Sequence, residues 1–95
     1  MTTIAEALDM LVRPDKTVAE VLTEAGCRGE HHARRCPVAV FLTKTTGRLA
    51  YAGIALAYEQ ISPDDWQTTD MPDDVTRFIG DFDAGRHPEL EVSDV

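Results

Sequence analysis

Apolar residues recur at helical spacing in the first part of the chain, where they predict two short helices. A threonine precedes each apolar stripe, with a glutamate three residues later, and this capping box satisfies free amides at a helix start. The boxes run from Thr3 to Glu6 and from Thr17 to Glu20. Gly26 follows the second stripe and suits the left-handed position that ends a helix. We therefore expect two helices joined by a tight corner.

A third helix is predicted to begin at Pro37, because proline is favoured at the first helical position. Gly47 can end it. Val40 and Lys44 would lean outward. The inward face would consist of Val38, Phe41, Leu42 and Thr45.

Residues 48–61 fit two secondary structures. Four alanines favour a helix, whereas the alternation of apolar side chains favours strands. Gly53 and the turn-forming residues 62–65 shift the prediction toward strands. Residues 66–69 would then form a short return strand.

The pattern from residue 70 onward predicts a C-terminal helix. Pro72 suits its first turn, and Asp73 and Asp74 suit the positive end of the helix dipole. Its apolar positions, at i, i+3, i+4 and i+7, are Val75, Phe78, Ile79 and Phe82. The expected fold class is α+β, with three N-terminal helices, a small antiparallel sheet of two or three strands and the C-terminal helix.

Length and charge extend this picture. The chain, residues 1–95, has the length of a single domain and a formal net charge of -8. Residues 51–95 carry eleven acidic and two basic side chains, whereas residues 26–50 carry one acidic and five basic ones. An acidic half repels phosphate backbones, which disfavours nucleic-acid binding and favours a basic protein partner. The same charge can also serve solubility alone.

No segment resembles a signal peptide, and no apolar run approaches the roughly 20 residues that span a bilayer. We therefore expect no membrane partner and a cytoplasmic location. Cysteines in that compartment are usually free thiols.

One stretch, the loop 27–36, concentrates residues that could do chemistry. Cys27, His31, His32 and Cys36 are ligand types that zinc accepts. Adjacent histidines point in different directions, however, so three of these ligands reach one ion more easily than four. We expect no cofactor, and zinc is the alternative that this loop allows.

The same loop allows other interpretations. Cys36 would lie at the start of the third helix, where the dipole stabilises a thiolate, and Arg34 and Arg35 would lower its pKa further. A reactive thiol, a redox sensor and a disulfide with Cys27 are therefore alternatives. The simplest interpretation is that both cysteines are inert, partly buried thiols. With Arg28, the arginines could hold an anion or pair with the acidic half of the chain.

The remaining candidates are single residues. His87 is expected on the surface after the last helix. Trp66 is expected to fill the core between sheet and helices, although exposed beside Tyr51 or Tyr58 it would suit the centre of an interface. The sequence contains none of the glycine-rich phosphate loops, nucleophile elbows or calcium loops that mark common active sites.

Two segments resemble a known group of proteins. One is Cys36-Pro-Val-Ala-Val-Phe-Leu42, and the other runs from Phe78 through Phe82-Asp83 and Gly85 to Pro88 and Leu90. Both are similar to segments of small proteins of actinobacteria and their phages, a group without an established activity. The resemblance implies one intact intracellular domain and carries over no catalytic residue.

We therefore expect a small acidic domain that binds another protein and has no catalytic activity; a regulator encoded by a phage or its host would fit the resemblance. Its contacts would come from Arg28, Arg34, Arg35, Trp66, Asp73 and Asp74. One alternative is a zinc-stabilised module. Another is an acidic mimic of DNA, which requires the carboxylates of residues 59–83 to form a spaced double row.

Overall fold

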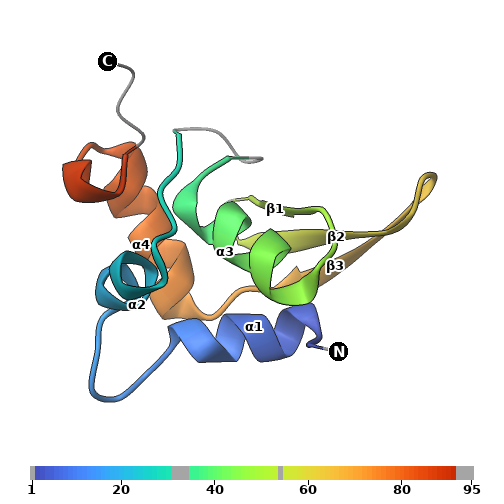
Figure 1. Ribbon diagram of the computed structural model, residues 1–95, viewed down its shortest axis with the longest axis horizontal. Coiled ribbons are helices and arrows are strands. Elements are labelled where there is room, and N and C mark those ends of the chain that lie inside the picture. Colours follow the sequence, from blue (N-terminus) through green and yellow to red (C-terminus); the bar gives the residue numbers. More distant parts are fainter. Residues whose placement is uncertain (1, 31–34, 54, 92–95) are drawn as a thin grey trace.

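The computed structural model describes residues 2–30, 35–53 and 55–91. The helices are α1 (Ile4–Leu11), α2 (Val18–Ala25), α3 (Pro37–Thr46) and α4 (Asp73–Asp83), followed by a short 3-10 helix, η1 (Pro88–Leu90). The strands are β1 (Ala50–Ala52), β2 (Leu56–Ser62) and β3 (Asp65–Asp70). This order confirms the α+β prediction and adds η1, which the sequence analysis did not predict (Figure 1).

Local signals start and end the helices as predicted. In both capping boxes the threonine hydroxyl accepts the glutamate amide, at 3.1 Å from Glu6 N to Thr3 Oγ1 in α1. Gly26 ends α2 in the left-handed conformation, with φ of 71°, and Gly47 does the same for α3. Because these groups lie within a few residues of each other, they act independently of the rest of the fold.

The core lies among the α-helices and continues beneath α3 onto one face of the sheet. Its fully buried side chains include Leu8, Leu11, Leu22, Val38, Leu42, Val75 and Phe82. Helix α3 is central, since it contacts α1, α2 and β1. Lys44 is exposed, as predicted, but Val40 and Thr45 are half-buried and Thr46 is buried. The buried surface of α3 is wider than one stripe because two layers enclose it.

The ambiguous segment 48–61 contains β1 and most of β2 and no described helix. The sheet is antiparallel in the order β1-β2-β3, with a turn at residues 63–64 and an irregular register between Gln60 and Ser62. Small alanines of β1 and β2 form the inner face, which allows α3 to pack closely. The β2–β3 hairpin extends beyond the helices (Figure 1). No helix in the described part of the chain is long and apolar enough to cross a membrane.

Candidate functional site

The described part of the loop 27–36 contains two buried, free thiols. The Cys27 residue is 1% exposed and Cys36 is 3% exposed. The other predicted zinc ligands, His31 and His32, lie outside the described residues. Among the residues that are described, no three histidine, cysteine, aspartate or glutamate side chains form a group that could hold a metal ion.

Backbone contacts fix both ends of this loop. The Gly29 amide donates to the Leu90 carbonyl at 2.9 Å, and the Glu30 amide donates to the Arg35 carbonyl at 2.7 Å. A Cβ atom built on Gly29 would lie 2.1 Å from the Arg35 carbonyl oxygen, so only glycine fits between the two chain segments. The C-terminal segment after α4 therefore positions the loop.

Cys36 occupies the N-cap position of α3, and its Sγ accepts the Ala39 amide at 3.4 Å. Burial nevertheless raises the pKa of the Cys36 thiol, because the loss of solvation outweighs the lowering effect of the Ala39 and Val38 amides. Burial likewise raises the pKa of Cys27. Burial thus disfavours the alternative of an activated thiolate at Cys36. Desolvation, which a sequence does not show, exceeds the helix-end effect.

The predicted arginines are only partly described. Arg28 and Arg35 are exposed, and Arg34 lies outside the described residues. Arg35 pairs with Glu30 of the same loop, with 3.4 Å between Nη1 and Oε2, and with no acid of the C-terminal half among the described residues. An exposed pair of this length contributes little to stability.

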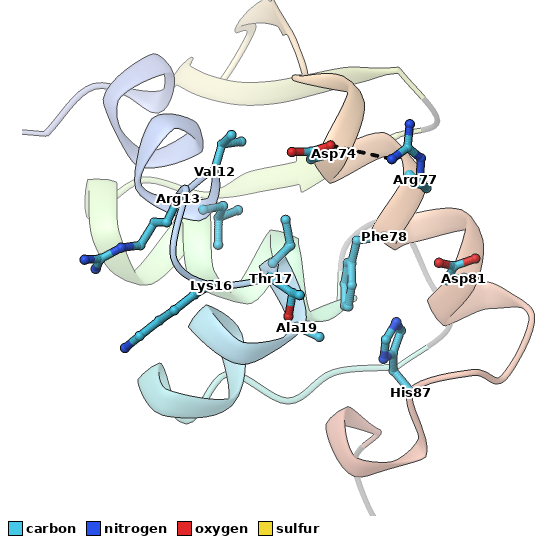
Figure 2. Close-up of a pocket in the computed structure, with 12 residues that line it drawn as sticks. Val12, Arg13, Lys16, Thr17, Ala19, Asp74, Arg77, Phe78, Asp81 and His87 are labelled. Atoms are coloured by element: carbon cyan, nitrogen blue, oxygen red, sulfur yellow. Dashed lines mark ion pairs between the residues drawn. The ribbon is translucent and has the colours of Figure 1, made fainter.

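A groove of about 390 Å³ lies between the α1–α2 corner and α4 (Figure 2). Its lining includes Val12, Arg13, Lys16, Thr17, Phe78 and His87. Phe78 and His87 point into the groove, whereas Arg13 and Lys16 extend away from it (Figure 2). Lys16 reaches Glu24, with 2.6 Å between Nζ and Oε2. Because Arg13 and Lys16 point outward and Arg77 pairs with Asp74, the groove is not a built anion site.

His87 was expected on the surface after the last helix, but it lines this groove. Its ring centroid is 4.9 Å from that of Phe78, and its Nδ1 is 3.2 Å from Glu89 Oε1. The pKa of the Glu89 carboxyl is lowered first by its own backbone amide and further by His87. Gly85, with φ of 79°, reverses the chain after α4 and returns His87 onto the helix. In the sequence, the glycine at position 85 was the signal that could have placed His87 near α4. The Thr17 hydroxyl, which also lines the groove, caps α2 by accepting the Glu20 amide at 3.1 Å.

The prediction that Trp66 fills the core is wrong. Cross-strand neighbours share a face of a sheet, and Trp66 lies opposite Gln60, beside the row of Tyr51, Tyr58 and Thr68. This face points away from α3. The side chains of Trp66 and Tyr51 meet with ring centroids 4.9 Å apart and an interplanar angle of 31°. Trp66 is exposed beside Tyr51, which is the arrangement that would suit the centre of an interface.

We call this surface the open face; its apolar members are Leu49, Tyr51, Tyr58 and Trp66. The residues of Leu49, Tyr58 and Trp66 are 43%, 36% and 37% exposed. Exposed aromatic side chains grouped in this way are typical of protein interfaces.

The open face lies in the most acidic part of the chain. Residues 49–76 contain no lysine, arginine or histidine. Glu59 is buried and pairs with Arg48, with 3.1 Å between Oε1 and Nη1. Asp73 and Asp74 are exposed in the first turn of α4, as predicted.

The predicted contact residues do not form one surface. The loop before α3 and the hairpin that carries Trp66 lie in different parts of the molecule (Figure 1). Asp74 pairs with Arg77, with 3.7 Å between Oδ1 and Nη1, on the groove side of α4 (Figure 2). The structure therefore offers three separate candidates, namely the loop, the groove and the open face. No family model, no curated protein and no solved structure matches the chain.

Proposed function

We propose that the protein is a binding domain that recognises another protein through the open face, without catalytic activity of its own. The observation that carries this proposal is the contact of exposed Trp66 with half-buried Tyr51, flanked by exposed Tyr58 and Leu49. Tryptophan and tyrosine supply large contact areas at low entropic cost and dominate the energy of many interfaces.

The loop 27–36 and the groove are weaker candidates for a functional site than the open face. The thiols of Cys27 and Cys36 are buried with raised pKa values, which disfavours a nucleophile. The groove is lined by His87, which contacts Glu89, and by Thr17, whose hydroxyl is used as a helix cap. Two free thiols also favour a reducing compartment, and we propose a cytoplasmic location on that basis.

Acidic mimicry of DNA receives less support than protein binding. Glu59 is buried and paired, so it cannot belong to an exposed row of carboxylates. Asp64 and Asp65 lie at the hairpin, whereas Asp81 and Asp83 lie at the far end of α4 (Figure 1). This scattered placement differs from the regular spacing of phosphates along a duplex.

Affinity capture with matched variants tests the proposal. The bait is the full chain as wild type, Trp66→Ser or Met10→Ser, and the extract comes from cells that produce the protein. Met10 is exposed like Trp66 but lies on α1, so its substitution removes an apolar side chain of a different surface. We expect wild type and Met10→Ser to retain the same protein and Trp66→Ser to lose it. Equal capture by all three baits would overturn the proposal.

A further inference from the structure

The hydrogen bonds of the sheet show which backbone groups of β3 face outward. The Met71 amide donates to the Ala55 carbonyl at 3.0 Å, in line with the register that β2 and β3 keep from Leu56–Asp70 to Gln60–Trp66. In an antiparallel ladder the bonded pairs alternate, so Thr69 and Gln67 also bond to β2. The amides and carbonyls of the residues between them therefore point away from the sheet. These residues are Trp66, Thr68 and Asp70.

The two edges of the sheet differ in what covers them. At the β1 edge, Thr43 of α3 accepts the Ala50 amide at 3.0 Å, and its hydroxyl lies 3.3 Å from the Ala50 carbonyl oxygen. Strand β3 instead packs chiefly on β2, and its outward amides donate to no other described residue. An uncovered edge is a template for a further strand. In this part of the molecule, β3 provides that template.

The side chains at this edge belong to the open face. In a strand, residues two apart share a face. Thr68 and Asp70 therefore lie on the same face as Trp66, which contacts Tyr51 there. A strand added to β3 would lay every second side chain next to this surface. Backbone pairing and side-chain contacts would thus come from the same three residues.

Charge decides which strand fits. Asp64 and Asp65 flank one end of β3 and Asp70 lies at the other, within a stretch that has no basic residue. A second copy is a poor occupant: pairing its outward groups antiparallel would place each Trp66 opposite the other copy's Asp70, with Asp64 and Asp65 close by. Like charges would then meet at both ends of the new ladder. Arginine, by contrast, can pair with aspartate and stack on tryptophan.

We propose that the β3 edge binds an extended, basic segment of another protein, which adds to the sheet as a fourth strand. Its basic side chains lie over the open face, against Asp70 and Trp66. This inference rests on the proposed function and names the chemistry of its partner.

Synthetic peptides of six residues, the length of β3, test this inference. The probe alternates arginine and valine, and a second peptide alternates glutamate and valine. Binding is measured by fluorescence anisotropy and mapped by amide shifts of the isotope-labelled full chain. We expect the arginine peptide to bind at least tenfold more tightly and to shift the amides of Trp66, Thr68 and Asp70. Equal affinities, or shifts confined to another surface, would overturn the inference.

Backbone methylation separates strand addition from simple charge attraction. One arginine peptide carries N-methyl groups on its arginine amides, and the other carries them on its valine amides. An added strand turns only one set of amides toward β3, so one peptide loses at least tenfold in affinity and the other keeps it. An antiparallel strand with arginine over the open face uses the arginine amides. Equal affinities for the two peptides would contradict strand addition.

A protein variant completes the test. Thr68→Pro removes an outward amide and leaves the ladder to β2 intact, so we expect a folded protein that binds the arginine peptide at least tenfold more weakly. Unchanged binding would count against the edge. Suppose the peptides fail but Trp66→Ser still loses its cellular partner: then the open face is an interface without strand addition. If Trp66→Ser keeps the partner, the proposed function is wrong, and the inference that rests on it is wrong as well.

Discussion

Cys27 and Cys36 show how burial controls chemistry at the scale of single residues. The raised pKa values of both thiols predict slow alkylation of the folded protein. At pH 8 we expect iodoacetamide to label the native chain at least about 100-fold more slowly than the urea-unfolded chain, because reaction requires opening of the fold. Labelling followed by mass spectrometry measures both rates. A fast native rate that levels off near pH 8.5, as for an exposed cysteine, would refute this.

The same shifts give a pH dependence of stability. A thiol whose pKa is raised by folding holds its proton more tightly in the native state, so its contribution is fully present below the pKa of the unfolded chain. We therefore expect the free energy of unfolding to fall as pH rises above about 8.5, where the unfolded thiols ionise. Urea titrations of wild type and of Cys36→Ala across this range provide the comparison, and the variant should show the shallower fall.

Two glycines form a matched pair for a stability prediction. At Gly29, an added Cβ would lie 2.1 Å from the Arg35 carbonyl oxygen, whereas at Gly80 it would meet nothing within 4 Å. We expect Gly29→Ala to destabilise the fold by about 3 kcal/mol, since the loop must shift and its bond to Leu90 weakens. Gly80→Ala in α4 should stabilise it by about 1 kcal/mol. Urea unfolding of both variants measures the difference, and equal effects would contradict the close approach at Gly29.

Single residues were also where sequence-based prediction was least successful. Trp66 was assigned to the core because large aromatic residues are mostly buried, yet its side of the sheet depends on its pairing with Gln60 of β2. His87 required knowledge of the chain reversal at Gly85. Both positions depend on how the chain turns back on itself, at residues 63–64 and at Gly85, which the spacing of apolar residues does not specify.

At the scale of elements, local signals sufficed for the helices and almost sufficed for the strands. The capping boxes at Thr3 and Thr17 and the helix start at Pro37 all depend on groups within one turn of each other. In residues 48–61, alanine propensity and strand alternation compete, and the structure favours the alternation. Ala50, Ala52 and Ala57 are small inner-face residues on the side of the sheet where α3 packs.

The register of β3 makes a prediction that depends on the direction of one amide. The Gln67 amide bonds to β2 and the Thr68 amide points outward, as the alternation from Met71 shows. Gln67→Pro should therefore destabilise the fold by about 3 kcal/mol, and Thr68→Pro by about 1 kcal/mol. Thermal unfolding of the two variants makes the comparison. If Thr68→Pro were the more damaging of the two, the register would be wrong by one residue.

At the scale of the whole molecule, the distribution of charge along the chain was predictable. The position of the acidic residues around the β3 edge was not. The sequence places the acidic residues in the second half, and the fold then places part of them around the one strand edge that α3 does not cover. The loop 27–36, which looked like the chemical centre of the chain, instead has two buried thiols at its ends. Burial and edge exposure are properties of the assembled fold, so they decided between the candidates.

The final prediction concerns self-association through β3. Pairing two β3 edges antiparallel would place Asp70 opposite Trp66 and next to Asp64 of the other copy, at both ends of the ladder. Asp70→Lys would replace two repulsions by two ion pairs and add a lysine over each tryptophan. Asp73→Lys makes the same change in net charge in the first turn of α4, off the strand.

We therefore expect Asp70→Lys to dimerise at least about tenfold more strongly than wild type and Asp73→Lys, because two symmetric contacts change at once. Sedimentation velocity over a range of concentrations measures the association constant. If Asp73→Lys dimerised as strongly as Asp70→Lys, net charge alone would govern association. If neither variant differed from wild type, repulsion by the Asp70 carboxylate would not prevent self-association through this edge. The main electrostatic reason to prefer a basic partner strand over a second copy would then be lost.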